Sequence, residues 1–534
     1  MRVAYVNVRA YTVAPDQEWA SAFIVTDGVI THIGTDDEVR GQIDQDDQVV
    51  DLQGRMAMPG IHDAHTHLVS GLNNWEVSFP AAADENGILV ALQAWQGPRP
   101  TDVHGNQWLV GGRYWPTALG PRGPHRDFLD EAYPHHPVML HDRSGHNVLT
   151  NSRGLELAGI DASTPDTKNG QVIRDRDGRP TGELYEHARW PLFRVMGRHD
   201  DDVVEQAIRY AMALNHHYGV TSVQDASSTA QLLRVLGVLD ASNSLKLQVA
   251  GHLVWREESF GMADLGELDR MIEHHSDYAS EHVDTRFVKF WLDGSPIPPY
   301  WTHSCIHEDG TVDEDHLLIP QEEMKAAVAR FDALELSVKI HCGGEGAIRR
   351  ALDAIQHARS VNGPDGPRHE LAHCCLVADQ DFPRFAQLNV GAEMSPAVWH
   401  LPEHNVSDMY FFDVVVASGA EMTLGTDWSV SASPNLFPAL QGTVEHGAHS
   451  IDLKTGLAAL TINGAKAVGK HATRGSLEVG KSADFIVLDR NLLEVPVSEV
   501  GDTKVLRTYF EGELVYDAAD PARLEPGRSE RRAR

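Results

Sequence analysis

The stretch PGIHDAHTH, from Pro59 to His67, decides the fold because it combines a predicted strand with two histidines at its end. His65 and His67 are separated by one residue, and side chains two positions apart on a strand project from the same face. Two imidazoles on one face can reach the same metal ion. The chain contains 30 histidines, so this pair alone is weak evidence for a metal site, and other metal-binding residues are needed to support it.

Seven further short apolar segments follow this strand, and helical patterns alternate with them. These segments begin at Val220, Leu245, Phe287, Leu336, His369, Val390 and Met422. Eight strands that alternate with helices are typical of a (β/α)8 barrel. The sequence therefore predicts an α/β fold with a TIM-like barrel over residues 59–473.

The interval between the first two strands is too long for one crossover. About 150 residues separate His67 from Val220, where a crossover needs only a few dozen. We therefore predict an inserted subdomain over 70–200 that covers the catalytic face like a lid; an insertion with a remote structural role is the alternative.

The two ends of the chain share a different pattern, in which short segments of alternating apolar and polar residues are separated by turn residues. Residues 1–58 and 474–520 are expected to build one small composite domain, a β-sandwich. The final segment, 521–534, combines Pro, Gly and several arginines and is expected to form a flexible tail.

The composition narrows the possible partners. Acidic residues outnumber basic ones by 77 to 45, and the net charge of -32 disfavours binding to nucleic acid or to an anionic membrane. The four cysteines include two sequence neighbours, and the N-terminus lacks a secretion signal, so a cytoplasmic protein without disulfides is expected. The predicted partner is a small-molecule substrate, and a homo-oligomer stays open.

Four more residues that suit a metal site end other predicted strands, namely Lys289, His341, His373 and Asp427. The carboxyl ends of barrel strands converge on one opening, so these side chains are expected to meet His65. An ammonium group cannot bind a metal, but carbon dioxide would convert Lys289 into an anionic carbamate able to bridge two ions. A structural lysine beside a single metal is the alternative.

Several longer motifs now support a family resemblance. They are PGIHDAHTHL, DRSGHNVLTNSRGLELAGI, GVTSVQDA, VKFWLDGS, IHCGGEGAI, LGTDWSV and GSLEVGKSADFIVLD. With these motifs the chain resembles the amidohydrolase superfamily nearly end to end. Within that superfamily it is similar to the amidohydrolase 3 (YtcJ-like) branch, which includes N-substituted formamide deformylases.

The resemblance implies a role for each candidate ligand. The first metal would be held by His65 and His67, the second by His341 and His373, with carboxylated Lys289 bridging them and Asp427 touching the metal and its water. Two features depart from the branch pattern: PIPPYWTHS follows the DGS motif, and a glutamate, Glu345, replaces the usual aspartate. Both departures bear on the substrate rather than on metal binding.

This ligand set predicts the reaction. Zinc lowers the pKa of bound water from 15.7 to about 7, which makes a nucleophile available at neutral pH. Asp427 is the expected catalytic residue, which accepts a proton from the attacking water and passes it to the leaving nitrogen. The sequence therefore predicts a hydrolase with one or two zinc ions that cleaves a non-peptide C–N bond in an N-substituted amide or formamide.

Five residues are expected to contact the substrate. His146 would reach the site from the inserted segment, and tryptophans just after predicted strand ends would line an apolar pocket. Local hydrogen bonding is the alternative role for the histidine, and ordinary packing is the alternative for the tryptophans, which are Trp291, Trp301, Trp399 and Trp428.

Three other functions are less consistent with the sequence. Residues 369–373 spell HELAH, which matches the zincin signature, but the segment is too short for the required helix and lacks a third ligand. A mononuclear zinc deaminase of the same superfamily needs a glutamate soon after the third histidine strand, and Glu345 matches that position poorly. A non-catalytic scaffold predicts missing ligands, whereas all six positions are filled.

Overall fold

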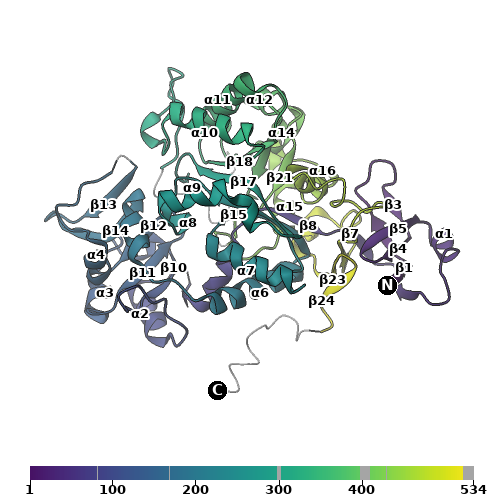
Figure 1. Ribbon diagram of the computed structural model, residues 1–534, viewed down its shortest axis with the longest axis horizontal. Coiled ribbons are helices and arrows are strands. Elements are labelled where there is room, and N and C mark those ends of the chain that lie inside the picture. The colour runs from purple at the N-terminus through teal and green to yellow at the C-terminus, as the bar shows by residue number, and fades with distance from the viewer. Residues whose placement is uncertain (81, 168, 297–301, 397–408, 429, 521–534) are drawn as a thin grey trace.

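An eight-stranded parallel sheet forms the centre of the protein (Figure 1). The computed structural model describes residues 1–80, 82–167, 169–296, 302–396, 409–428 and 430–520. The strands, which follow one another round the sheet in chain order, are β8 (Ile61–Thr66), β15 (Val220–Ser228), β16 (Gln248–Val254), β17 (Val283–Trp291), β18 (Ser337–Cys342), β19 (His369–His373), β20 (Val390–Met394) and β21 (Met422–Leu424). Each predicted segment overlaps one of them, although β17 begins four residues before the predicted start at Phe287, so the eight-stranded parallel arrangement is confirmed.

Hydrogen bonds between the first strand and the residues after the last one nearly close this sheet into a barrel. The Asp427 N–H donates to the His65 carbonyl oxygen at 2.6 Å, and the His67 N–H donates to the Trp428 carbonyl oxygen at 2.8 Å. Thr66 and Trp428 also form a parallel bridge. This seam places Asp427 beside His65 and His67.

Helices cover the outside of the barrel, and apolar side chains fill the layer between. On β18, Val338 and Ile340 belong to this core, while Lys339 and His341 alternate with them and face the other way. The helices are α6 (Asp201–His217), α7 (Ala230–Ala241), α8 (Glu258–Gly261), α9 (Leu265–Glu273), α10 (Gln321–Ala333), α11 (Glu345–Asn362), α12 (Phe382–Gln387), α14 (Phe412–Ala417), α15 (Phe437–Val444), α16 (Leu453–Ala459) and α17 (Ile462–Ala467).

The segment between β8 and β15 forms a second sheet, on the left of Figure 1. Its own apolar clusters include Leu140 on one side and Met139 on the other. In sheet order its strands are β13 (Gly170–Arg174), β14 (Pro180–Glu186), β12 (Asn147–Thr150), β11 (Val138–Asp142), β10 (Leu109–Tyr114) and β9 (Val77–Ser78). Its helices are α2 (Glu85–Ala94), α3 (Asp127–Ala132), α4 (Ser152–Ala158) and α5 (Trp190–Val195).

Strands from both ends of the chain lie together on the right of Figure 1. One sheet has the order β5 (Val29–Gly34), β4 (Ala22–Thr26), β1 (Arg2–Val6), β6 (Gln48–Asp51), with α1 (Asp36–Arg40) nearby. The other has the order β24 (Glu513–Asp517), β23 (Val505–Phe510), β22 (Phe485–Leu488), β7 (Met56–Pro59), β2 (Arg9–Tyr11), β3 (Trp19–Ala20).

Aromatic side chains join the two ends of the chain in one apolar core. The ring centroid of Tyr5 lies 4.9 Å from that of Phe485, and Phe485 stacks on Tyr509 at 4.2 Å. The expected tail, 521–534, lies outside the described residues.

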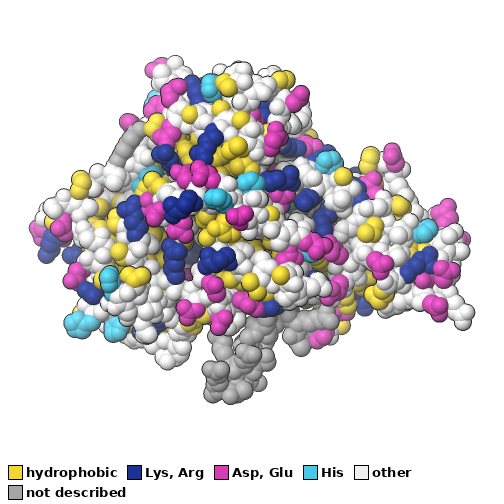
Figure 2. Space-filling view, viewed as in Figure 1, with side chains coloured by type: hydrophobic (Ala, Val, Ile, Leu, Met, Phe, Trp, Pro, Cys, Tyr) yellow, Lys and Arg dark blue, Asp and Glu magenta, His cyan; other side chains and the backbone are white. Residues whose placement is uncertain are grey.

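The surface carries many charged side chains, with acidic and basic groups interspersed on the face shown in Figure 2. Among the described residues, no helix combines the length and the apolar character that crossing a bilayer requires. The four cysteines are free thiols, and three of them, Cys342, Cys374 and Cys375, are buried.

Candidate metal centre

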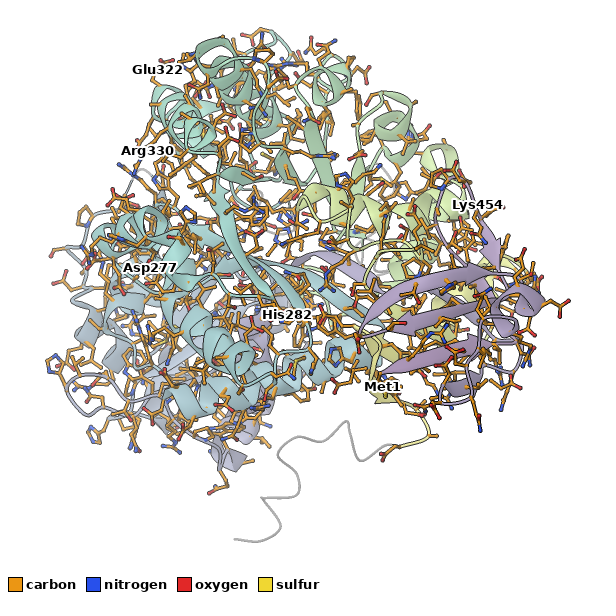
Figure 3. The ribbon with its side chains drawn as sticks, turned by 45° about the vertical axis from the view of Figure 1, so that its right-hand side comes forward. Met1, Asp277, His282, Glu322, Arg330 and Lys454 are labelled. Carbon is orange, nitrogen blue, oxygen red and sulfur yellow. The ribbon has the colours of Figure 1, made fainter. Side chains whose placement is uncertain are left out.

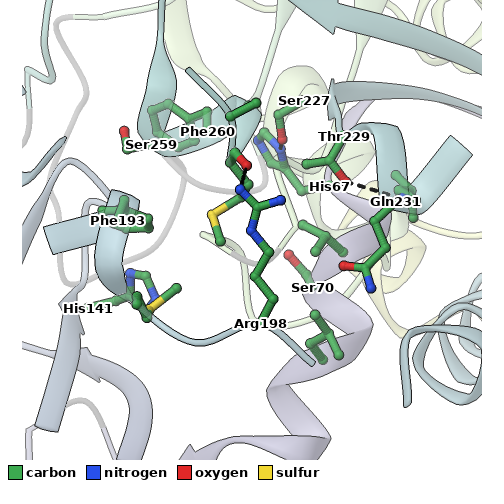
Figure 4. A pocket seen from close by; sticks show the side chains of 18 of the residues that line it. His67, Ser70, His141, Phe193, Arg198, Ser227, Thr229, Gln231, Ser259 and Phe260 are labelled. Carbon is green, nitrogen blue, oxygen red and sulfur yellow. Dashed lines mark hydrogen bonds between the residues drawn. The ribbon is translucent and has the colours of Figure 1, made fainter. Parts of the chain in front are cut away.

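All six predicted ligands line one cavity of about 350 Å³ at the carboxyl ends of the barrel strands. His65 lies in β8 and His67 just after it, Lys289 lies in β17, and the remaining ligands are supplied by β18, β19 and the turn after β21. Figure 4 shows His67 beside Ser227 in the wall of this cavity. The structure thus brings together residues that lie as far apart in sequence as His65 and Asp427.

The distances show how closely these side chains approach one another. His67 Nε2 lies 3.1 Å from Asp427 Oδ1, and His65 Nε2 lies 3.8 Å from the same oxygen. Lys289 Nζ lies 3.3 Å from His65 Nε2. The His373 ring centroid is 4.7 Å from that of His65 and 4.5 Å from that of His341. These side chains therefore surround one small space.

Each of the four histidines uses one ring nitrogen to contact a protein oxygen away from the other ligands. For His65 and His67 the second nitrogen, Nε2, faces Asp427, so both rings could turn one nitrogen toward a shared metal. This is the usual arrangement of metal-binding histidines, because the outer contact fixes the ring orientation and the tautomer. The contacts are His65 Nδ1 with Glu393 Oε2 at 2.7 Å, His67 Nδ1 with Ser227 Oγ at 2.7 Å, His373 Nδ1 with Ser395 Oγ at 3.2 Å, and His341 Nε2 with the Gly294 carbonyl oxygen at 3.1 Å.

Burial keeps the imidazoles in the form that binds metals. The pKa values of His65 and His341 lie well below the ordinary value, chiefly because a buried charge is not hydrated. The same effect lowers the pKa of His373 to about 3. Neutral imidazole has a free lone pair, so these side chains are ready to act as ligands.

Lys289 is also shifted toward its neutral form. Burial, followed by the positive charge of Lys339, lowers the pKa of Lys289 to about 7. A neutral amine reacts with carbon dioxide and an ammonium group does not. Near neutral pH, a substantial fraction of Lys289 therefore has the protonation state that carbamate formation needs.

Asp427 has the opposite preference and is ionised. Burial alone would raise its pKa, but the neighbouring histidines, chiefly through the hydrogen bond from His67, outweigh burial and hold the pKa well below its usual range. Its backbone φ of 48° lies in the left-handed region, as does that of His373 at 74°. Such conformations are costly for residues with side chains and are concentrated at functional sites.

One important residue was missed by sequence reasoning. Glu393 lies in β20, where its Oε2 contacts His65 Nδ1 at 2.7 Å and also accepts the His373 N–H at 3.2 Å. A single buried carboxylate thus orients two ligands. The available signal was a lone acidic residue in the otherwise apolar strand VGAEM.

The donor set fits a zinc ion. His65, His67 and Asp427 each offer one ligand atom, and these atoms lie within 4.8 Å of one another. A second such group consists of His65, His373 and Glu393, although there the glutamate contacts the outer nitrogen of His65. Neutral imidazole nitrogens and a carboxylate oxygen are the ligands that catalytic zinc takes.

Two of the predicted substrate contacts line the same cavity. His146, from the segment between β8 and β15, lies with its ring centroid 5.3 Å from that of His341, and its Nδ1 contacts Glu186 Oε2 at 3.0 Å. Trp291 stacks on Phe260 at 4.4 Å with parallel ring planes.

The other predicted substrate contacts are placed differently. Trp428 is buried in the barrel core and is not among the described residues that line the cavity. Trp301 and Trp399 lie outside the described residues.

The two segments that suggested other functions do not have the structure that those functions require. HELAH forms β19, so its two histidines do not share the helix face that a zincin requires. Glu345 begins α11, where its Oε1 accepts the Ile306 N–H at 3.3 Å. This glutamate is absent from the described cavity lining.

Comparisons with known proteins find relatives that match nearly the whole chain. The N-substituted formamide deformylase of Arthrobacter pascens is 27% identical, covering 96% of this chain and 98% of that protein. The putative amidohydrolase YtcJ of Bacillus subtilis is 21% identical, covering 95% and 98%.

Solved structures share the fold. An uncharacterized metal-dependent hydrolase from Pyrococcus horikoshii matches with a TM-score of 0.73 at 22% identity, covering 94% of this chain and 100% of that one. An adenosine deaminase from Xanthomonas campestris with bound zinc matches at 0.57 and 14% identity, covering 98% and 95%. A model of the amidohydrolase family matches residues 48–516, a range that includes all six converging side chains, and the chain belongs to that family.

Proposed function

We propose that this protein is a zinc-dependent hydrolase that cleaves the C–N bond of an N-substituted amide or formamide. The observation that carries the proposal is the convergence of four histidines, a low-pKa lysine and an ionised aspartate around one cavity. The likeness to a formamide deformylase supports the choice of bond.

The proposed assignment gives each ligand a place. His65 and His67 would hold one zinc ion, His341 and His373 a second, and carboxylated Lys289 would bridge them. When bound, zinc lowers the pKa of a coordinated water to about 7 and polarises the amide carbonyl group. Glu393 keeps His65 and His373 in the required orientation.

Asp427 is the proposed proton carrier. Its carboxylate is ionised and is held 3.1 Å from His67 Nε2, at the edge of the space that the ligands surround. From there it would accept a proton from the attacking water and deliver it to the leaving nitrogen, a role that typically contributes about 10²- to 10⁴-fold in rate.

The proposed substrate contacts line the same cavity as Asp427. Trp291 and Phe260 would pack against an apolar substituent, and His146 would contact the amide from the inserted segment. Because both the barrel and residues 70–200 line the cavity, we also propose that the insertion acts as a lid over the site. A cytoplasmic location is a separate proposal, which rests on the four free cysteines.

The test is a coupled assay on protein stripped by a chelator and then reloaded with zinc in bicarbonate buffer. Formamides, longer acylamines and aminopurines are offered, and formate, carboxylic acid and ammonia are measured separately. Zinc-dependent release of formate or acid is expected. Release of ammonia from the aminopurine alone would replace this proposal with a deaminase, and metal-independent turnover would contradict it.

A further inference from the structure

The inserted segment meets the barrel at the end of its strand β14. Glu186 is the last residue of β14, and the short 3-10 helix η3 (His187–Arg189) follows it directly. The Glu186 side chain is buried, and its backbone φ of 46° lies in the left-handed region. A residue with a side chain keeps this conformation only where its surroundings hold it, and such residues are concentrated at functional sites. Glu186 is therefore a candidate for a functional role, and its contacts indicate which one.

The Glu186 carboxylate joins two parts of the molecule. Its Oε2 lies 3.0 Å from His146 Nδ1, and its Oε1 accepts the Thr302 hydroxyl at 3.2 Å. His146 belongs to the insertion and lines the cavity, whereas Thr302 belongs to the barrel segment between β17 and α10. One buried carboxylate thus links the insertion to the barrel beside the metal centre.

Thr302 extends this contact to the residues just after β17. The Gly294 N–H donates to the Thr302 carbonyl oxygen at 3.1 Å, and the Ser295 N–H donates to Thr302 Oγ1 at 3.0 Å. A hydroxyl group can accept one hydrogen bond while it donates another. The Thr302 hydroxyl therefore connects the backbone at Ser295 with the Glu186 carboxylate.

Gly294 is the point at which this chain of contacts reaches a proposed metal ligand. A methyl group built on Gly294 would lie 2.1 Å from Thr302 Oγ1 and 2.7 Å from Glu186 Oε1, so only glycine fits at this position. The Gly294 carbonyl oxygen lies 3.1 Å from His341 Nε2. Because a carbonyl oxygen can only accept, the imidazole hydrogen lies on Nε2, and Nδ1 of His341 is the nitrogen that can bind a metal.

Asp293 holds the base of the same loop independently of the insertion. Its carboxylate accepts the N–H groups of Gly343 and Gly344 after β18 and the N–H group of Ser304. These bonds fix the loop where it leaves the barrel and where it returns. Loss of the Glu186 contact should therefore shift Gly294 without unfolding the loop.

We propose that Glu186 is a positioning residue through which the inserted segment orients His341 for metal binding. The same carboxylate fixes His146, whose ring centroid lies 5.3 Å from that of His341. The insertion then contributes to the metal centre as well as to the cavity wall, because one of its side chains holds the loop against which His341 rests. This role rests on the proposed function, in which His341 is a zinc ligand.

A second buried carboxylate at the same boundary provides a matched comparison. Glu257, in the segment after β16, has Oε2 3.1 Å from His187 Nε2, and its Oε1 accepts the Trp190 indole N–H at 2.8 Å. Both partners belong to the insertion. These contacts hold the insertion on the segment after β16 and do not involve the loop that carries Gly294. Glu257 thus shares the burial and the boundary of Glu186 but not its path to His341.

The first test measures zinc affinity in the full-length chain by competition with a fluorescent chelator. Glu186→Gln keeps the size of the side chain but loses one accepting oxygen, so zinc affinity should fall about 10-fold, as expected when a contact that orients a metal ligand is lost. Glu257→Gln should lower the thermal unfolding midpoint to a similar extent and leave zinc affinity near that of wild type. Equal losses of zinc affinity in the two variants, or none in Glu186→Gln, would overturn the role of Glu186.

Variants of Thr302 test the path between Glu186 and His341. Thr302→Val removes the hydroxyl group and should reproduce the loss of zinc affinity, whereas Thr302→Ser keeps the hydroxyl group and should restore it. Because residues in one chain of contacts do not act independently, the double variant Glu186→Gln/Thr302→Val should lose no more affinity than the weaker-binding single variant. Additive losses would contradict a shared path.

Crystals of the metal-free protein separate this inference from the proposed reaction. The hydrogen bond between His341 Nε2 and the Gly294 carbonyl oxygen should be present in wild type and Glu257→Gln and lost in Glu186→Gln. If Glu186→Gln keeps this bond, the positioning role is wrong even for an active formamide hydrolase. If the bond is lost as expected but zinc-loaded wild type cleaves no formamide, only the proposed reaction fails.

Discussion

The two walls of the cavity are built in different ways. The wall with the metal ligands consists of barrel strand ends and their closing turns, and its histidines are fixed by buried contacts such as the one between Glu393 and His65. The opposite wall comes from the segment between β8 and β15, where Arg113 and Arg189 meet at Gly145. In the proposed function the first wall supplies the groups that carry the chemistry, and the second contacts the substrate through His146. Mutations in the two walls should therefore have different kinetic signatures.

The largest effect is expected from Asp427→Asn. The amide keeps the size of the side chain but cannot carry the proton, so kcat should fall by about 10²- to 10⁴-fold while zinc content stays near that of wild type. Steady-state kinetics and metal analysis of the same preparation check this. Full turnover in the variant would show that Asp427 does not carry the proton. It would also contradict the proposal that the first wall carries the chemistry.

Lys289→Ala should act mainly on metal stoichiometry. If the carboxylated lysine bridges two ions, its removal weakens the bridged site, and short carboxylates such as propionate should partly restore activity. Zinc per protein is measured with and without the added acid, and Lys289→Met serves as a variant of similar length. Unchanged stoichiometry in both variants would contradict the carbamate.

Glu393→Gln should weaken zinc binding, although Glu393 is not one of the proposed metal ligands. Loss of a carboxylate that orients a metal-binding histidine typically costs about 10- to 100-fold in metal affinity. Competition with a fluorescent chelator measures this affinity, and Glu322→Gln, which changes an exposed residue of α10, is the matched control. An affinity equal to wild type would show that His65 and His373 hold their orientation unaided.

The smallest effect is expected far from both walls, at His282. This side chain lies between the barrel and the chain-end strands (Figure 3), with Nδ1 2.6 Å from Asp240 and Nε2 3.3 Å from Glu511. Burial alone would lower its pKa, but the two carboxylates outweigh burial and raise the pKa above 6.5.

A raised pKa means that the folded state binds the His282 proton more tightly than the unfolded state. The stabilisation is therefore complete below pH 6.5 and is lost as the pH rises through the folded pKa. Urea unfolding at pH 6 and pH 8 should show that His282→Gln removes a pH-dependent part of the unfolding free energy of up to about 1 kcal/mol. The control is His307→Gln at the surface, and an identical pH dependence in both variants would contradict this account.

The barrel and its ligands could be predicted from sequence because the signals are local. A buried parallel strand reads as a short apolar segment, and a polar residue at its end is visible without knowing its neighbours. His65, Lys289 and Asp427 all have this form. Their meeting follows from barrel geometry alone, which is why eight strands and a converging ligand set could be anticipated together.

The opposite wall could not be predicted in this way. Arg113 lies on β10, and its approach to Gly145 depends on how β10, β11 and β12 pair within the inserted sheet. Glu393 was missed for a related reason, since its role becomes visible only when β20 is placed beside β19. Contacts between segments distant in sequence decide both cases. The lone glutamate in VGAEM indicates a polar role for Glu393, but it does not identify the histidines that this side chain contacts.

The most direct test of the central claim is anomalous diffraction at the zinc edge from crystals of the zinc-loaded protein grown with bicarbonate. The account predicts zinc between His65, His67, His341, His373 and Asp427, with carbamate density extending from Lys289. Zinc bound elsewhere in an active preparation, or Lys289 unmodified and directed away from the ion, would contradict it.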